Sequence, residues 1–345
     1  MTHERPETLD SLRRPLRDLR ISVTDRCNLR CAYCMPREVF GQEFVFLRHA
    51  DLLSFEEIVR IARQCVTLGV RKIRISGGEP LLRRGIERLV EMLARLHGEG
   101  GKPIELAMTS NGTLLAKKAR ALKDAGLARL NISLDALDEA VFRRMSGGRS
   151  SPAAVLEGIA AAQAAGFAPL KLNTVIKRGV NESEILPLLD HFRHSGIIVR
   201  FIEYMDVGES NGWRLDDVVT VREMLTRIDA EYPLQPIDAR SPGEVAQRWE
   251  YVDGGGEIGV IASVTQPFCG DCGRLRLSTD GKLYPCLFAA EGVDLRAPLR
   301  GGENDLQLQR RIAAAWAARA DRYSQRRHAA SGSSVRKIEM SYIGG

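Results

Sequence analysis

Two groups of closely spaced cysteines are the residues of this chain best suited to chemistry. The first group, Cys27, Cys31 and Cys34, has three residues between its first two members and two between its last two. Thiolates this close on one segment can converge on a soft metal centre. A cubane iron–sulfur cluster usually takes four cysteine ligands, so three would leave one iron open. The spacing therefore favours a reactive iron–sulfur centre.

Zinc and a disulfide are the alternatives for this first group. Structural zinc takes four nitrogen or sulfur ligands, and the next histidine, His49, lies too far along the chain for a compact finger. A disulfide needs an oxidising compartment, whereas the N-terminal residues contain no apolar signal segment. Iron–sulfur is the favoured interpretation, and zinc stays open.

A second group, Cys269, Cys272 and Cys286, lies near the other end of the chain and has no nearby histidine. Zinc completed by a neighbouring aspartate or a distant histidine is an alternative here too, but a second cluster with an open iron is favoured. Arg274 and Arg276 share one side of a predicted strand. Beside a cluster, two guanidiniums would match the oxygens of a phosphate.

The composition is that of a long chain without a membrane segment. Its 345 residues are enough for one large α/β domain with an appendage, or for two domains. The formal net charge of +6 allows an anionic substrate or nucleic acid but requires neither. We expect the seventh cysteine, Cys65, to be an inert core thiol in a helix. No apolar run reaches membrane-span length, so we expect a soluble cytoplasmic protein.

Short apolar runs alternate with helix signals through the first two-thirds of the chain. A capping box at Ser54–Glu57 and the pair Ser151-Pro152 each predict the start of a helix. Because parallel strands need crossover connections, the alternation predicts an incomplete (β/α)6 TIM-like barrel. Chemistry in such barrels is done at the carboxyl ends of strands, where the first cysteine group falls. The predicted strands are 19–23, 72–75, 104–108, 130–134, 170–176 and 199–202.

After about residue 231, prolines and glycines interrupt this alternation of apolar runs and helix signals. The pattern then predicts a smaller β-rich C-terminal region with one helix at 307–319. We therefore divide the chain into a partial barrel, 1–230, and an auxiliary-cluster and substrate-binding region, 231–345. We also expect both cysteine groups to face one pocket at the mouth of the barrel. The predicted C-terminal strands are 249–252, 258–263, 274–278 and 282–286.

The first cysteine motif resembles that of the radical S-adenosylmethionine (SAM) enzymes. In that family SAM chelates the open iron, and a Gly-Gly-Glu-Pro segment such as 77–80 contacts its amino group. Two glycines allow close backbone approach, and a carboxylate can accept from an ammonium. Taken alone, this segment could be an ordinary turn. The resemblance implies that SAM is bound by Tyr33, Gly78, Glu79, Ser133 and Met205.

Further segments resemble one branch of these enzymes, the GTP 3′,8-cyclases of molybdenum-cofactor biosynthesis. The similarity spans nearly the whole chain, and the cysteine and arginine pattern at 268–276 is its most specific part. A small departure is Ser110, where relatives often have threonine. The similar segments are 18–28, 77–80, 131–135, 171–175, 200–205, 259–261, 268–276 and the terminal Gly344-Gly345.

This resemblance implies two [4Fe–4S] clusters and SAM as cofactors, with the two cysteine groups as metal ligands. A 5′-deoxyadenosyl radical would remove the ribose 3′ hydrogen of GTP, and the carbon radical would attack guanine C8. Reduction of the resulting radical by one electron and one proton would give (8S)-3′,8-cyclo-7,8-dihydroguanosine 5′-triphosphate, which makes the enzyme a lyase. The implied catalytic residues are Arg20, Arg274, Arg276, Gly344 and Gly345. The implied GTP-binding residues are Arg20, Arg74, Thr109, Lys171, Arg274, Leu275 and Arg276.

The implied partners are a low-potential electron donor and the pathway enzyme that makes cyclic pyranopterin monophosphate; a homodimer is allowed, and neither nucleic acid nor membrane is expected. A peptide-modifying radical SAM enzyme is the nearest alternative, but it should carry more C-terminal cysteines. An RNA-modifying enzyme should show a dense basic patch with stacking aromatics, whereas aromatics are only 6% of this chain. A two-zinc nucleic-acid module is also disfavoured, because each cysteine group of this chain supplies only three ligands and the predicted α/β body is large.

Overall fold

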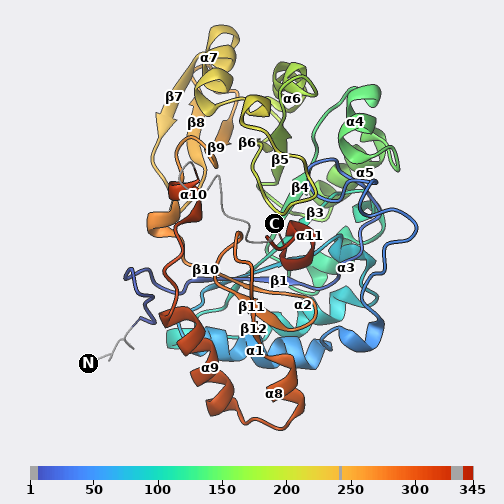
Figure 1. The fold of residues 1–345 in the computed structure, drawn as a ribbon. Coiled ribbons are helices and arrows are strands. Elements are labelled where there is room, and N and C mark those ends of the chain that lie inside the picture. The colour runs from blue at the N-terminus through green and yellow to red at the C-terminus, as the bar shows by residue number, and fades with distance from the viewer. Residues whose placement is uncertain (1–6, 241–242, 328–336, 345) are drawn as a thin grey trace.

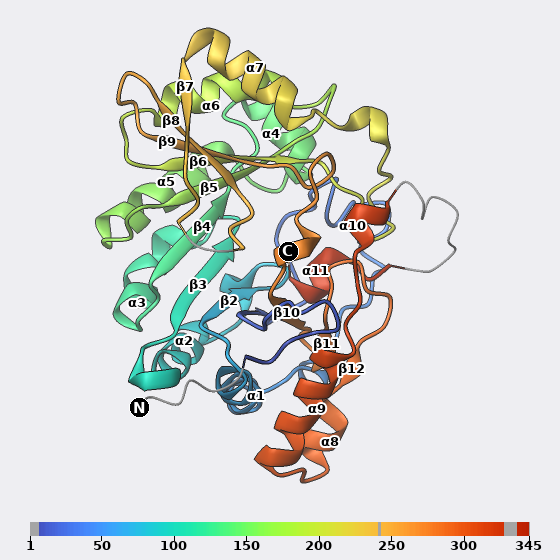
Figure 2. The same ribbon diagram turned by 90° about the vertical axis from the view of Figure 1, so that its left-hand side faces the viewer.

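The computed structural model describes residues 7–240, 243–327 and 337–344. Within these ranges one continuous sheet of twelve strands runs through the molecule, in the order β12-β11-β10-β1-β2-β3-β4-β5-β6-β9-β8-β7. Figures 1 and 2 show this sheet curving around an interior, with helices on its outer side. No helix of the described residues is long and apolar enough to cross a membrane.

The centre of the sheet confirms the predicted incomplete (β/α)6 barrel. Its six central strands are adjacent in chain order, and each pairs in parallel with the next. All six predicted strands are present, shifted by a few residues at most. They are β1 (Asp18–Ser22), β2 (Lys72–Ser76), β3 (Glu105–Ser110), β4 (Arg129–Ser133), β5 (Lys171–Ile176) and β6 (Ile198–Glu203).

Helices follow these strands as crossover connections. The Ser54 hydroxyl accepts from the Glu57 backbone N–H at 3.1 Å, and the Glu57 carboxylate accepts from the Ser54 backbone N–H. These two bonds confirm the predicted capping box. Cys65 is fully buried, as expected. The helices are α1 (Phe55–Thr67), α2 (Ile86–Ala94), α3 (Ala119–Asp124), α4 (Glu139–Ser146), α5 (Pro152–Ala164), α6 (Ile185–Phe192) and α7 (Val221–Glu231). Short 3-10 helices fill turns: η1 (His49–Asp51), η2 (Pro80–Leu82), η3 (Glu99–Gly101), η4 (Leu115–Lys117), η5 (Glu182–Glu184), η6 (Leu215–Asp217) and η7 (Cys269–Asp271).

The C-terminal region extends both edges of this barrel sheet. β9 pairs in parallel with β6, and β10 pairs in parallel with β1. The strands are β7 (Leu234–Ile237), β8 (Gln247–Tyr251), β9 (Glu257–Ile261), β10 (Arg274–Leu277), β11 (Lys282–Tyr284) and β12 (Val293–Asp294). The helices are α8 (Arg296–Arg300), α9 (Asp305–Ala317), α10 (Tyr323–Arg326) and α11 (Met340–Ile343). The division of the chain at residues 230 and 231 stays a prediction.

The central strands alternate apolar and charged residues. In β1, Leu19 and Ile21 are fully buried and belong to the apolar core beneath the helices. Successive side chains of a strand point to opposite faces, so Arg20 between them faces the interior of the barrel. β2 repeats the pattern with Arg74 between Ile73 and Ile75. Burying each large apolar side chain contributes roughly 1.5–3 kcal/mol to the free energy of folding. Because the apolar face of each strand packs under the helices, the charged face points to the interior of the barrel.

Candidate active site

The first cysteine group lies on the loop after β1, at the carboxyl end of the central strands. The segment after β2 runs alongside the start of this loop: Gly78 N–H donates to Thr24 O at 2.7 Å, and Glu79 N–H donates to Arg26 O at 2.8 Å. A Cβ on Gly78 would lie 2.2 Å from Arg26 O. Glycine at this position is therefore needed for the close approach of two backbones.

Cysteine side chains on this loop are half-buried and free. The Cys27 sulfur accepts from Leu29 N–H at 3.4 Å and from the Asn111 amide at 3.8 Å. Burial raises the pKa of Cys27 to about 11, and it also raises the pKa values of Cys31 and Cys34. A bound metal would supply the positive charge that these thiolates need.

The donor set fits an iron–sulfur cluster. Among the described residues, no three side chains of His, Cys, Asp or Glu converge closely enough to hold a single metal ion. A [4Fe–4S] cluster takes its thiolates on separate irons, so its ligands need not meet at one point. Three half-buried thiols on one loop suit such a cluster.

Glu79 joins the ends of β2 and β3. Its buried carboxylate accepts from Leu81 N–H at 3.0 Å, the Ser110 hydroxyl at 2.9 Å and Asn111 N–H at 2.8 Å. Burial raises the pKa of Glu79 to about 7, and these hydrogen bonds oppose the rise. The carboxylate thus fixes the segment that packs on the cysteine loop. Its predicted contact with the SAM amino group stays a prediction.

Tyr33 links the cysteine loop to the end of β4. Its hydroxyl donates to the Asp135 carboxylate at 2.9 Å, and that carboxylate also accepts from Val175 N–H at 3.0 Å. Burial raises the pKa of Asp135 to about 6. Ser133 and Met205 are half-buried at this same carboxyl end of the sheet. The structure therefore gathers the predicted SAM residues at one edge, and their contacts with SAM stay predictions.

A row of guanidiniums crosses the barrel interior. Arg20 on β1 is in register with Arg74 on β2 and with Arg276 on β10. Arg276 is buried and the other two are half-buried. Burial lowers the pKa of Arg20, and the neighbouring arginines lower it further. Arg20 Nε has no hydrogen-bond partner within the described part of the chain. Such a row is suited to an anion.

The row continues through β3 to β6. With its amide oxygen facing the guanidiniums, Asn131 accepts from Arg74 and from Arg200, each at 2.7 Å. Thr109 accepts from Arg74 at 3.2 Å. Burial lowers the pKa of Lys171 to about 8, as does the nearby Arg200. The structure thus brings the predicted Arg74, Thr109 and Lys171 together.

Arg200 and Asn131 were not among the site residues predicted from the sequence. Both lie in segments similar to the cyclases, but neither received a role. The available signal was an isolated charged or amide residue inside an otherwise apolar predicted strand. Leu275 was predicted as a substrate contact, yet its side chain is fully buried in the apolar core. A contact of Leu275 with substrate would therefore come through its backbone.

The second cysteine group lies at the opposite end of these strands. Arg274, the first residue of β10, is in register with Asp18, the first residue of β1. Cys269 and Cys272, just before β10, therefore lie at the amino end, and Cys286 follows the antiparallel β11 to the same end. The expectation that both groups lie at the mouth of the barrel is wrong, because β10 pairs in parallel with β1. The row of guanidiniums lies between the two groups.

Charge around this second group favours a thiolate. Burial disfavours the charged form of Cys272, but Arg274 and Arg319 outweigh burial and lower its pKa to about 6. Burial raises the pKa of Cys286 to about 11. Arg274 also lies 4.9 Å from the centroid of the Phe268 ring. Cys272 therefore lies next to cations that favour its thiolate, the form that binds a metal cluster.

The C-terminal tail enters this interior beside β1, as Figure 1 shows for α11. Gly344 O accepts a hydrogen bond from Arg276 Nη1. A Cβ on Gly344, whose φ is +75°, would lie 3.2 Å from the Ser76 Cβ at the end of β2. Ile343 is fully buried before it. The structure places Gly344 among the predicted site residues, whereas Gly345 lies outside the described residues.

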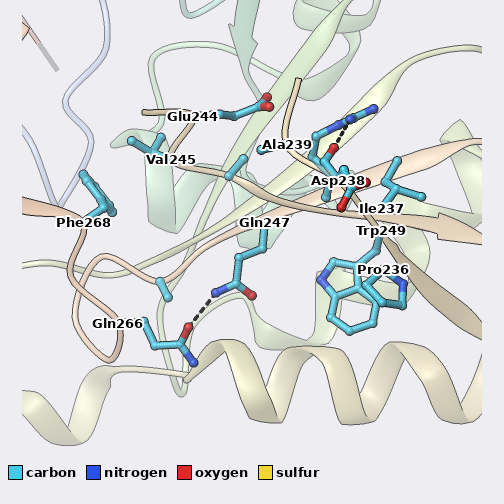
Figure 3. Close-up of a pocket in the computed structure, with 13 residues that line it drawn as sticks. Pro236, Ile237, Asp238, Ala239, Glu244, Val245, Gln247, Trp249, Gln266 and Phe268 are labelled. Atoms are coloured by element: carbon cyan, nitrogen blue, oxygen red, sulfur yellow. Dashed lines mark hydrogen bonds between the residues drawn. The ribbon is translucent and has the colours of Figure 1, made fainter. Parts of the chain in front are cut away.

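A pocket of about 470 Å³ opens beside the β7–β9 hairpin edge. Figure 3 shows Trp249 and Pro236 on one wall, with Gln247 hydrogen-bonded to Gln266 at 2.7 Å. Phe268 contributes to its lining and touches Arg274 from there. No site residue predicted from the sequence lines this pocket. We therefore do not place the predicted chemistry in this pocket.

Comparison with known proteins shows which class of enzymes shares these features. The Radical SAM superfamily matches residues 21–192, and the family Molybdenum Cofactor Synthesis C matches residues 197–325. SuiB of Streptococcus suis bound to its precursor peptide has a TM-score of 0.51 and 21% sequence identity, covering 63% of this chain and 46% of that chain. SuiB bound to S-adenosylmethionine gives the same TM-score over 63% of this chain and 48% of that chain. The barrel and its cysteine loop are those of the radical SAM class.

Relatives that match over nearly the full length of the chain identify its family within this class. The GTP 3′,8-cyclase of Acidothermus cellulolyticus is 53% identical, over 97% of this chain and 98% of that protein. The GTP 3′,8-cyclase of Xanthomonas campestris is 50% identical over 97% of both chains. That of Staphylococcus aureus is 46% identical over 97% of this chain and 98% of that protein. The chain belongs to the GTP 3′,8-cyclase family of radical SAM enzymes.

Proposed function

We propose that this protein is a lyase that converts GTP to (8S)-3′,8-cyclo-7,8-dihydroguanosine 5′-triphosphate in molybdenum cofactor biosynthesis. The observation that carries the proposal is the row of interior cations between two cysteine groups at opposite ends of the strands. A triphosphate is a concentrated anion, and such a row would hold it between the two metal centres. The likeness to the peptide-bound SuiB concerns the fold alone and does not favour a peptide substrate.

Two [4Fe–4S] clusters would fit the two cysteine groups, and SAM bound at the first would supply the radical chemistry that removes hydrogen from ribose C3′. Cys27, Cys31 and Cys34 would hold the first cluster, and Cys269, Cys272 and Cys286 would hold the second. The SAM residues lie at the carboxyl edge. There the segment 77–80, whose backbone is hydrogen-bonded to the start of the cysteine loop, orients SAM. The SAM residues are Tyr33, Gly78, Glu79, Ser133 and Met205.

The chain's own contribution is to bind, orient and enclose GTP. Guanidiniums from neighbouring strands, with Lys171, bind the triphosphate. Arg274 and Arg276 stand nearest the second cysteine group and bind phosphate oxygens at that end of the row. The tail, anchored by Ile343 and bonded through Gly344, keeps water from the reacting carbon. The triphosphate ligands are Arg20, Arg74, Thr109, Lys171, Arg200, Arg274 and Arg276.

We propose further that a low-potential donor supplies electrons and that the next enzyme of the pathway converts the product to cyclic pyranopterin monophosphate. A cytoplasmic location and a homodimer are compatible with this role.

Anaerobic reconstitution tests the function directly. The iron-loaded enzyme is incubated with SAM, a reductant and one of GTP, ATP, CTP or UTP. GTP alone should yield stoichiometric 5′-deoxyadenosine and a product of the same mass as GTP but with different chromatographic retention and fragmentation. SAM cleavage that is unaffected by any nucleotide, with no new product, would contradict the proposal.

Arg276 and Arg274 test the anion site. Arg274→Ala and Arg276→Ala should each weaken GTP binding by roughly 1.5–3 kcal/mol, because each removes a charge-assisted phosphate contact. SAM cleavage without substrate should persist. Equilibrium GTP binding and 5′-deoxyadenosine release are the measurements. Arg88→Ala is the control, since Arg88 is exposed on the outer helix α2 and pairs with Glu56. Normal GTP binding by both variants would show that the assignment is wrong.

The tail is tested by deleting Gly344 and Gly345. The deletion removes the Gly344 carbonyl that accepts from Arg276, but touches no cysteine loop. Iron content and uncoupled SAM cleavage should stay near wild type, while formation of the cyclised nucleotide is lost. Iron analysis and product chromatography measure both. Full product yield from the truncated chain would mean that the tail is dispensable.

A further inference from the structure

Three buried charged residues lie behind the second cysteine group. The Asp10 carboxylate accepts from Arg14 Nε at 2.6 Å and from Arg319 Nη1 at 3.3 Å. None of the three side chains is more than 2% exposed. Asp10 and Arg14 precede β1, whereas Arg319 follows α9. We call these three residues the buried triad.

Both arginines of the buried triad bond to the cysteine loop itself. Arg14 Nη1 donates to the Cys269 carbonyl at 2.8 Å, and Arg319 Nη1 donates to the Cys272 carbonyl at 2.5 Å. These two carbonyls stand at the start of η7 and just after its end. The orientation of both cysteines therefore depends on the two guanidiniums.

The buried triad is itself held rigidly. Arg14 also donates to Asp321 O at 2.9 Å, and its own carbonyl accepts from Trp316 Nε1 at 3.1 Å. Trp316 is fully buried on α9, and the Arg319 guanidinium lies 4.7 Å from its ring centroid. Packing thus fixes the guanidiniums before any ligand binds.

The charges of the buried triad do not cancel. Two guanidiniums face one carboxylate, which leaves one positive charge in excess at a buried place. Arg14 Nη2 and Arg319 Nε have no hydrogen-bond partner among the described residues. A buried unpaired charge is costly unless an anion is close. A cluster held by three thiolates on the adjoining loop would be such an anion.

We propose that Asp10, Arg14 and Arg319 form a positioning clamp for the second iron–sulfur centre. The two arginines hold the loop carbonyls of Cys269 and Cys272, and their excess charge balances the thiolate-bound cluster. The inference rests on the proposed function, since it requires a cluster at this group. Outer groups that orient ligands commonly decide how well a metal is retained.

The test isolates the second cluster in the full-length chain. Replacing Cys27, Cys31 and Cys34 by Ala leaves only the second group able to hold iron. Arg319→Gln, Arg319→Lys and the control Arg310→Gln are then made in this parent. Arg310 is exposed on α9, the helix that ends just before Arg319. Arg319→Gln leaves the Asp10–Arg14 pair intact, so it creates no unpaired carboxylate.

Three measurements separate the roles of the clamp. We expect Arg319→Gln to lose iron to a chelator roughly 10-fold faster than the parent. Its midpoint potential should be more negative, because a positive charge that favours the reduced cluster is gone. Arg319→Lys should lose iron equally fast but keep a potential near that of the parent. Thermal melting checks that each variant folds. If Arg319→Gln does not fold, the comparison of Arg319→Lys with the parent decides the test.

Each outcome is decisive. Unchanged iron retention and potential in both Arg319 variants would overturn the clamp while leaving the proposed function intact. Equal changes in Arg310→Gln would overturn it too, since they would show a general effect of charge. A parent that binds no iron would overturn the proposed function and the clamp together.

Discussion

Enclosed positive charge is the constraint on which the rest of this structure depends. Arg20, Arg74 and Arg276 lie side by side in register, and the other two disfavour the charge of Arg20. A barrel filled in the usual way would place branched apolar side chains there. This interior instead carries cations, which are favourable only when an anion occupies the space between them. An anion between them relieves this repulsion, which contributes to affinity for a phosphate-rich substrate.

The continuous sheet is what brings distant segments to that interior. Because β10 pairs with β1 and β9 pairs with β6, the C-terminal region extends the sheet of the partial barrel at both edges. The same pairing sends the second cysteine group to the end opposite the first. A substrate held by the row of cations therefore lies between the two centres. The tail adds a third element at this place, through the bond between Arg276 and Gly344 O.

Local features of the fold could be predicted from the sequence. The six barrel strands follow from short apolar runs, and the start of α1 follows from the Ser54–Glu57 capping box. Each depends on residues only a few positions apart. The cysteine groups could also be found, because ligand spacing is local. Gly78 was recognised by its motif, and the structure supplies the reason: a side chain would collide with Arg26 O.

Long-range pairing could not be predicted in the same way. The edge strands β7 and β12 are short and mostly exposed, so no apolar run marks them. The position of the second cysteine group depends on β10 joining β1, more than 250 residues away. Asn131 and Arg200 acquire their roles only when β4 and β6 bring them to Arg74. Arg14 and Arg319 likewise meet only in the folded chain, through Asp10.

Transfer of a labelled hydrogen tests the central claim most directly. The claim is that the interior holds GTP with its ribose C3′ facing the radical produced at the first cysteine group. With GTP deuterated at C3′, the account predicts that the 5′-deoxyadenosine formed gains one deuterium, as read by mass spectrometry. GTP deuterated at C2′ should give unlabelled 5′-deoxyadenosine. Deuterium arriving from C2′, or none from C3′, would contradict this account.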